Sequence, residues 1–259
     1  MPSDYRHIHF NIEDRVARIT FARPPVNIFN IAMMSEINDA LNRSAHEREL
    51  VALVFDAASD SRAFSAGVAV EEHVEETIFQ MLDSFHAIFR NLEQLAKPTI
   101  AVIDGPALGG GCELVAACDI AIASERALFS QPEIKLGVFP PVAAVLLPQI
   151  VGDKRARELI LTGEPIEAAE AMRLGLVNYV VPNPQLEQKL RELLSVFRGL
   201  SAAALELTKK AIDLGRGRSL DSALKDVENM YLHELMKTQD ATEGINAFIQ
   251  KRKPVWRNR

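Results

Sequence analysis

Long apolar segments are missing from this 259-residue sequence. No run of about 18 apolar residues occurs, and Met1 to Arg6 contain no apolar signal core. We therefore expect no membrane partner and a cytoplasmic location. An excess of basic residues is missing too, since 29 Lys and Arg stand against 35 Asp and Glu, for a net charge of -6. No nucleic-acid partner is expected, because the overall charge does not attract polyanions.

Cysteine and histidine are too few and too scattered for a metal centre. Cys112 and Cys118 stand six residues apart in a predicted helix, so they point to different faces and fit neither a disulfide nor a metal clamp. The six histidines show no metal-binding spacing. A Gly-x-Ser-x-Gly elbow, a P-loop and a dinucleotide fingerprint are also absent. Covalent serine hydrolysis and nucleotide hydrolysis are therefore not expected, and no metal is predicted.

Strand-like and helix-like segments alternate through the first two thirds of the chain. Strands are predicted at 5–10, 16–21, 51–55, 99–103 and 120–123, the first two joined as a hairpin through Glu13 and Asp14. Helical spacing of apolar residues follows Asn30 and recurs up to Leu95, before Pro98. From Pro184 onward only helices are predicted, at 185–197, 201–214, 219–237 and 240–251. This order predicts an α/β core at 1–198 and a helical C-terminal region at 199–259.

Three consecutive glycines, Gly109 to Gly111, lie between a predicted strand and an apolar helix. Glycines let a ligand approach the backbone, and the free N–H groups of a first helical turn attract an oxyanion. A close-packed turn also explains a glycine cluster taken alone. Glu113 favours a site, because a carboxylate in an apolar helix is costly unless it is hydrogen-bonded, protonated or used.

A second carboxylate among apolar neighbours, Glu133, follows twenty residues later. Two carboxylates that share one water and differ in pKa can act as general base and general acid in one step. The sequence does not show whether Glu113 and Glu133 converge, and an acidic residue beside proline is usually a loop charge. The small-residue loop at 62–70 could offer N–H groups to a carbonyl, or it is a plain connection.

These segments resemble the enoyl-CoA hydratase/isomerase (crotonase) family. The resemblance covers nearly the whole chain in order, through AFSAG (63–67), KPTIAVIDG (97–105), ALGGGCE (107–113), QPEIKLG (131–137), LTGEPI (161–166), AAEAMRLGLV (168–177), LTKKA (207–211), EGI (243–245) and KRKP (251–254). It implies a spiral of ββα turns with a helical C-terminal trimerisation region. It also implies a homotrimer, or a hexamer built as a dimer of trimers.

The resemblance assigns roles to particular residues. Val68 and Gly110 stand where the family places its two oxyanion-hole N–H donors, next to Ala66, Gly67 and Gly109, which we expect at the substrate. Glu113 and Glu133 stand where its hydratases keep both glutamates. We expect Glu133 to give a proton to carbon and Glu113 to activate and orient the water. The substrate is an acyl-CoA thioester, so coenzyme A is part of the substrate and no separate cofactor is expected.

Two departures from the family pattern bear on the acyl group. Val68-Ala69-Val70 replaces Ala-Asp-Ile, and the stretch from Val138 to Ala144 replaces Gly-Ala-Gly-Gly. Exchanging glycine for Pro and Val stiffens and narrows a loop, which argues against a generalist for long straight chains. We expect Val138 and Phe139 at the acyl group. Val138-Phe139 before proline and the segments 71–73, 231–236, 240–241, 243–244 and 256–259 resemble the cyclohexa-1,5-diene-1-carbonyl-CoA hydratases of anaerobic aromatic degradation. Those enzymes form 6-hydroxycyclohex-1-ene-1-carbonyl-CoA.

Other functions stay open on the same scaffold. A general short-chain enoyl-CoA hydratase, an isomerase and a thioester hydrolase are alternatives, since fold does not fix function. A non-catalytic binding protein is a further alternative, against which the acidic balance and both retained glutamates speak. By analogy Lys251, with Arg252 and Lys253, would bind the CoA phosphates. A solvated basic tail explains these three residues equally well.

Overall fold

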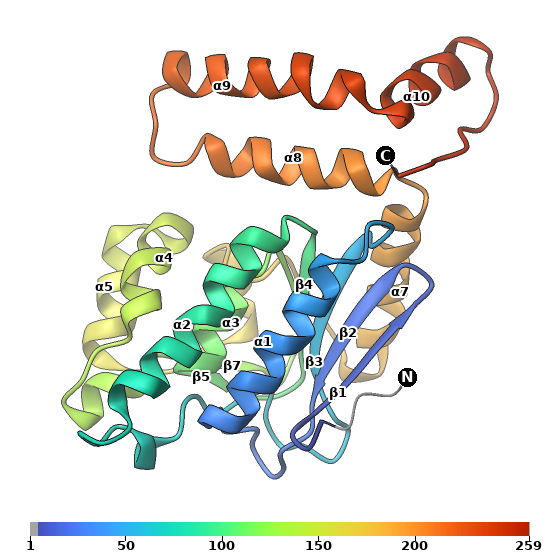
Figure 1. Ribbon diagram of the computed structural model, residues 1–259. Coiled ribbons are helices and arrows are strands. Elements are labelled where there is room, and N and C mark those ends of the chain that lie inside the picture. The colour runs from blue at the N-terminus through green and yellow to red at the C-terminus, as the bar shows by residue number, and fades with distance from the viewer. Residues whose placement is uncertain (1–4, 259) are drawn as a thin grey trace.

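The computed structural model describes residues 5–258, and its main element is a six-stranded sheet in the order β1-β2-β3-β4-β6-β9 (Figure 1). Its strands are β1 (Ile8–Glu13), β2 (Val16–Phe21), β3 (Ala52–Ala57), β4 (Thr99–Ile103), β6 (Ile120–Ser124) and β9 (Tyr179–Val181). β1 and β2 pair antiparallel, and each later neighbour pairs parallel. The predicted hairpin is confirmed. Its turn lies one residue later than predicted, at Asp14 and Arg15, because their φ angles of 47° and 65° suit a two-residue turn.

Helices cover both faces of this sheet. On one face lie α1 (Ile31–Ala45) and α2 (Ile78–Leu95), side by side in Figure 1, and α7 (Leu186–Arg198) lies on the other. Side chains alternate between the two faces, so Leu53 and Phe55 of β3 join the core beneath α1 and α2 while Val54 joins the core beneath α7. The central parallel strands β3, β4 and β6 are buried on both faces and therefore consist almost entirely of apolar residues.

A second, three-stranded sheet positions the glycine cluster and Glu133. It consists of β5 (Ala107–Leu108), β7 (Leu128–Ser130) and β8 (Ile166–Glu167), with β5 parallel to β7. Parallel strands end at the same edge. The residues after Leu108 and those after Ser130 therefore lie next to each other, and the N–H of Gly109 donates to the carbonyl of Ser130 at 2.9 Å. Helix α3 (Gly110–Ala117) starts from this edge, as does the short 3₁₀ helix η2 (Pro132–Leu136).

The stretch from Val138 to Ala144 was predicted to be a stiffened loop, and that prediction is wrong for its second half. Pro141 is the first residue of α4 (Pro141–Val151), where its missing N–H costs nothing and its fixed φ suits a helix. The chain continues through α5 (Asp153–Thr162) and α6 (Ala168–Arg173) to β9. Val138 and Phe139 remain in the connection between η2 and α4.

The C-terminal region is helical, as predicted. It contains η3 (Asn183–Gln185), α7, α8 (Ala202–Leu214), α9 (Leu220–His233), η4 (Leu235–Lys237) and α10 (Gln239–Ile249). In Figure 1, α8 and α9 run side by side, and α9 and α10 stand apart from the α/β core. The domain boundary at 198/199 stays a prediction. Among residues 5–258 no helix is long and apolar enough for a membrane span, and the cytoplasmic location also stays a prediction.

Candidate active site

The first loop of the candidate site carries Gly67 and Val68. Gly67 has φ +95°, which residues with a Cβ rarely adopt. Its carbonyl accepts from the N–H of Phe29 at 2.8 Å, and the N–H of Ala69 donates to the Phe29 carbonyl at 3.0 Å. The N–H of Val68 points away from this pairing, since it lies opposite the Gly67 carbonyl in a planar trans peptide. Among residues 5–258 it donates to no protein acceptor.

The second loop carries Gly109 and Gly110. Gly109 precedes α3 with φ +51° and ψ -125°, a conformation that favours glycine. Gly110 is the first residue of α3, so its N–H has no carbonyl one turn earlier to bond. No other acceptor for it exists in the described part of the chain. Gly110 therefore offers a free N–H at the positive end of the helix.

The two loops lie against each other. A Cβ built on Gly67 would lie 3.0 Å from the Leu108 carbonyl oxygen and 3.4 Å from the Gly110 nitrogen. A Cβ on Gly110 would lie 2.9 Å from Cγ2 of Val68. The free N–H groups of Val68 and Gly110 thus come from two backbones in close contact, as the pair of donors in an oxyanion hole must.

Glu113 is buried one turn into α3, with a relative exposure of 2%. Its Oε1 accepts from the N–H of Ala143 at 2.7 Å, and the N–H of Val142 also bonds the carboxylate. Both donors belong to the first turn of α4, whose dipole favours an anion there. Burial nevertheless raises the pKa of Glu113 to about 7, against the effect of the two N–H groups and with a further contribution from Glu133.

Glu133 sits in η2 and covers Gly109. A Cβ on Gly109 would lie 2.5 Å from Oε1 of Glu133, so the glycine makes room for the carboxylate. Oε2 of Glu133 is buried and has no hydrogen-bond partner within residues 5–258. Burial raises the pKa of Glu133. A buried acceptor without a protein partner marks a place where a water or a substrate atom binds.

The two glutamate carboxylates lie close enough to interact, which the sequence could not show. Glu133 packs on Gly109, and its negative charge contributes to the raised pKa of Glu113. Both carboxylates also act on the thiol of Cys112, whose pKa is raised by burial and then by their negative charges. No lysine or arginine pairs with either glutamate among the described residues. The site therefore holds one buried and one partly buried acid without a neutralising cation.

The remaining predicted substrate-binding residues fall into two groups. Ala66 lies in the first loop, where its N–H donates to the Val26 carbonyl at 2.9 Å. Val138 and Phe139 connect the element that carries Glu133 with the helix that holds Glu113, and both are exposed, at 40% and 68%. They lie in the chain between these two elements. Their contact with an acyl group stays a prediction, as does the contact of Ala66 with the substrate.

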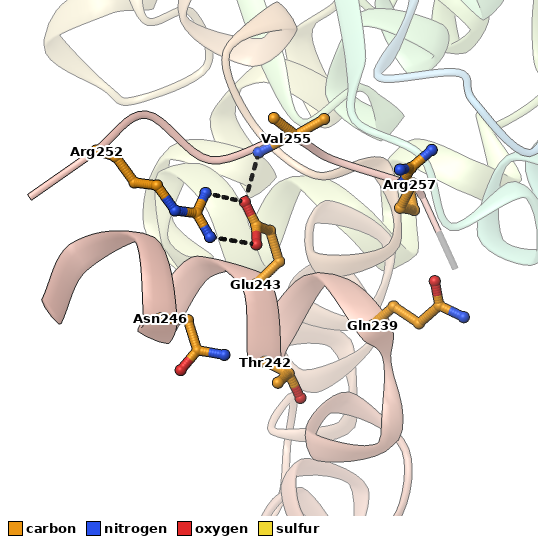
Figure 2. Close-up of a pocket in the computed structure, with 7 residues that line it drawn as sticks. All are labelled: Gln239, Thr242, Glu243, Asn246, Arg252, Val255 and Arg257. Carbon is orange, nitrogen blue, oxygen red and sulfur yellow. Dashed lines mark hydrogen bonds and ion pairs between the residues drawn. The ribbon is translucent and has the colours of Figure 1, made fainter. Parts of the chain in front are cut away.

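Lys251 is not brought to the glutamates. It follows α10, which stands apart from the α/β core in Figure 1. A hollow of about 430 Å³ lies in this region (Figure 2). There Arg252 donates to both carboxylate oxygens of Glu243 at 2.6 and 2.8 Å, and Val255 donates its N–H to the same group at 2.8 Å. No cluster of metal-ligating side chains is found among residues 5–258.

Three groups that shape the site were not predicted. The N–H groups of Val142 and Ala143 hold Glu113, and the proline pair Pro140-Pro141 was the signal for the helix start that provides them. Asn27 is fully buried, has φ +51° and anchors the first loop. A single asparagine in this loop gives no sequence signal for that role.

Comparison with known proteins gives independent evidence on the family. A family model described as "Enoyl-CoA hydratase/isomerase" matches residues 11–259. A cyclohexa-1,5-dienecarbonyl-CoA hydratase of Thauera aromatica is 37% identical over 242 residues, 93% of either chain. A short-chain-enoyl-CoA hydratase of Clostridium acetobutylicum is 36% identical over 248 residues, covering 93% of this chain and 94% of that protein. The crystal structure of an enoyl-CoA hydratase from Bacillus anthracis, 32% identical, matches with a TM-score of 0.92 over 98% of this chain and 100% of that one.

The fold and the two-acid site define a crotonase-type protein. The chain belongs to the enoyl-CoA hydratase/isomerase family, as its sequence motifs predicted. The predicted α/β fold and the predicted enzyme class, a hydro-lyase of the enoyl-CoA hydratase type, are confirmed at the level of the family.

Proposed function

We propose that this protein adds water to an α,β-unsaturated acyl-CoA thioester, with Glu113 and Glu133 as its catalytic acids and bases. The observation that carries the proposal is the pair of carboxylates, one buried and one partly buried, that lack a cation and lie beside the free N–H groups of Val68 and Gly110. Unneutralised acids with raised pKa values suit proton transfer near neutral pH. Adjacent N–H groups suit a thioester oxygen that gains negative charge.

Glu113 takes one proton from water while the water oxygen forms a bond to the β-carbon of the thioester. The electrons of the carbon–carbon double bond move to the thioester oxygen, where the N–H groups of Val68 and Gly110 stabilise the enolate. Glu133 then gives a proton to carbon, and the carbonyl forms again. Coenzyme A enters and leaves as part of the thioester, so the proposal needs no further cofactor.

For the acyl group we propose cyclohexa-1,5-diene-1-carbonyl-CoA, converted to 6-hydroxycyclohex-1-ene-1-carbonyl-CoA. Attack of water at ring carbon 2, the β-carbon, places the charge on the thioester oxygen through a dienolate. Protonation at ring carbon 5 then leaves a double bond beside the carbonyl and the hydroxyl on the other flank. Attack at ring carbon 6 would leave the charge on carbon 5, where the thioester cannot take it up. The proton donor must therefore reach across the ring.

Two observations support the cyclic substrate. The similar Thauera aromatica protein is named for it. The exposed Val138 and Phe139 begin the stretch, up to Ala144, that stands in place of the Gly-Ala-Gly-Gly of typical hydratases. This stretch joins the two elements that carry and hold the glutamates, and its Val and Pro residues make it bulkier and stiffer. A general short-chain hydratase is the second candidate, because the Clostridium acetobutylicum relative named for that activity is almost as similar.

The test is an assay of the wild type with the cyclic diene and with crotonyl-CoA, side by side in D₂O. Faster turnover of the diene, with deuterium on product carbon 3, is the expected result. Deuterium on product carbon 5 would contradict attack at the β-carbon. Faster turnover of crotonyl-CoA would select the second candidate, and no turnover of either thioester would contradict the hydratase itself.

We also propose that the protein assembles as a homotrimer or as a dimer of trimers. Its C-terminal helices expose large apolar side chains that no element of the described chain covers, namely Leu220, Tyr231, Leu232, Phe248 and Ile249. Exposed apolar patches on such helices are typical of interfaces. A neighbouring subunit would also explain how Lys251, distant from the glutamates of its own chain, could reach CoA phosphates. Light scattering that gives a monomer mass at micromolar concentration would contradict this assembly.

A further inference from the structure

Ser65 is a buried polar residue that the proposed chemistry does not use. Its relative exposure is 0%, and its hydroxyl makes two hydrogen bonds. Oγ donates to the Asn27 carbonyl at 2.7 Å and accepts from the N–H of Gly67 at 3.1 Å. The Ser65 side chain therefore connects a distant segment of the chain to the residue that precedes the Val68 donor.

The backbone of Ser65 holds the second loop. Its N–H donates to the Pro106 carbonyl at 3.3 Å, and its carbonyl accepts from the N–H of Leu108 at 2.9 Å. A Cβ built on Gly111 would lie 2.8 Å from both the Cβ and the carbonyl oxygen of Ser65. Ser65 thus contacts both loops whose N–H groups, on Val68 and Gly110, form the proposed oxyanion hole.

Asn27 makes the anchor of Ser65 rigid. Its Nδ2 donates to the carbonyls of Ala63 and Phe64 at 3.0 and 3.2 Å, and its Oδ1 accepts from the N–H of Arg23 at 2.9 Å. All of these partners are backbone groups on either side of the first loop. The carbonyl that receives the Ser65 hydroxyl is therefore fixed by contacts of its own residue with both segments.

Gly67 is the residue whose backbone conformation these hydrogen bonds restrain. It has no Cβ and φ +95°, so its hydrogen bonds, rather than side-chain packing of its own, help to set the plane of the peptide that carries the Val68 N–H. The Phe29 N–H holds the carbonyl of Gly67, and the Ser65 hydroxyl holds its N–H. Loss of the hydroxyl would leave a buried N–H unpaired and one side of Gly67 free to rotate.

We propose that Ser65 is a positioning residue that sets the direction of the Val68 N–H relative to that of Gly110. The proposal rests on the proposed function, because it presumes that these two groups bind the thioester oxygen. A hydrogen-bond donor in such a hole is worth about 10²- to 10³-fold in kcat. Tilting one donor without removing it should cost less, on the order of tenfold.

The experiment compares Ser65→Ala and Ser65→Cys with Ser44→Ala. Ser44 is also fully buried and gives one hydrogen bond to a carbonyl, that of Ala40 at 2.8 Å, but it lies in α1 away from both loops. We measure kcat and KM with crotonyl-CoA, or with the cyclic diene if the enzyme prefers it. We also record the infrared frequency of a ¹³C-labelled carbonyl in bound butyryl-CoA, which does not react.

Ser65→Ala should lower kcat about tenfold with KM changed less than about twofold, and should reduce the carbonyl frequency shift caused by binding. Ser65→Cys, which keeps a weak donor and acceptor in a slightly larger side chain, should fall between Ser65→Ala and the wild type. Ser44→Ala should match the wild type in kcat and in the frequency shift.

Two results would overturn the proposal, and they differ from failure of the function itself. An unchanged frequency shift and kcat in Ser65→Ala would show that the hydroxyl does not orient the donor. A lower melting temperature with an unchanged shift would make its role structural only. If the wild type itself causes no frequency shift, the oxyanion hole is wrong and the proposal for Ser65 fails with it.

Discussion

Carboxylates in two regions of this molecule have opposite surroundings. Around the glycine cluster, Glu113 meets only the N–H groups of α4, and Oε2 of Glu133 meets no protein donor. In the C-terminal region, Glu243 receives both nitrogens of Arg252 (Figure 2), and the buried Asp240 accepts from the N–H groups of Arg257 and Asn258 at 2.6 and 2.9 Å. Acidic side chains are held in place in both regions. Of the two, only the C-terminal region pairs a carboxylate with a cation among the described residues, and there donors bond both oxygens of either carboxylate.

The pKa values follow this difference. Burial raises the pKa of Glu113 to about 7, whereas the hydrogen bonds from Arg252 lower the pKa of Glu243 to about 2. A carboxylate that holds structure is stabilised as an anion, and one that transfers protons must be able to take a proton near neutral pH. Burial destabilises the Glu113 anion, and the same destabilisation allows Glu113 to take up a proton near neutral pH.

The largest expected effect separates the two regions by activity. Glu113→Gln and Glu133→Gln should each lower kcat about 10²- to 10⁴-fold, because each removes a proton-transfer group. Glu243→Gln should keep kcat within about twofold, since it alters a surface ion pair. Steady-state hydration assays on the three variants check this difference. Equal losses in all three would show that the contrast between the regions has no bearing on catalysis.

The next largest effect is expected at Gly109, which makes room for the Glu133 carboxylate. Gly109→Ala would put a Cβ 2.5 Å from Oε1 of Glu133, at φ +51°, and should lower kcat about 10²-fold by displacing the carboxylate. Gly217→Ala has a similar φ of +66° with no atom within 4 Å of the new Cβ. It should cost about 1–2 kcal/mol of backbone strain and leave kcat intact. Urea unfolding and kcat distinguish the two, and a fully active Gly109→Ala enzyme would contradict the placement of Glu133.

The pH dependence of stability should carry the signature of Glu113. Its pKa is about 7 when folded and 4.5 as the ordinary value, so the folded state binds the extra proton between these pH values. The free energy of unfolding of the wild type should therefore fall as pH rises from about 4.5 to 7, by about 3 kcal/mol at most. Glu113→Gln has no titrating group at this position, so its free energy of unfolding should not show this fall. Relative to the wild type, its free energy of unfolding should therefore rise between pH 5 and 8. Urea titrations check this, with the exposed Glu93→Gln as control; parallel curves for all three proteins would refute the raised pKa.

The smallest effect is expected at Glu243, and its sign is opposite. A lowered pKa gives stability that is present above 4.5 and is lost as pH falls toward about 2. The melting temperature of Glu243→Gln should lie slightly below that of the wild type at pH 7, because exposed ion pairs contribute little. The gap should close as the pH is lowered from 4.5. A gap that widens in acid would contradict the ion pair with Arg252.

Much of the fold was predictable because its periodicities are strong. The apolar strands, the helix up to Leu95 and the C-terminal helices follow from local pattern alone. The second sheet was not predictable, since β5 and β8 have two residues each and no period to detect. The helix after Pro141 was missed because its apolar first turn, next to two prolines, reads as a stiff loop.

The site was predictable in its residues and not in its geometry. Glu113 and Glu133 were identified by their apolar neighbours, and Val68 and Gly110 by family resemblance. Glu113 and Glu133 come together because β5 pairs with β7, which joins residues 107–108 to 129–130. The sequence contains no local pattern that predicts this pairing. Ser65 and Asn27 act through tertiary hydrogen bonds, so their importance emerges only from the folded chain. The role of Lys251 stays a prediction.

The most direct test of the paired glutamates is the hydration rate of the double variant Glu113→Gln/Glu133→Gln beside each single variant. Two carboxylates that act on one water form a unit, so removing the second after the first should cost almost nothing. The predicted kcat of the double variant is therefore within about twofold of that of the slower single variant. Losses that multiply, as they do for independent residues, would contradict a shared water between Glu113 and Glu133.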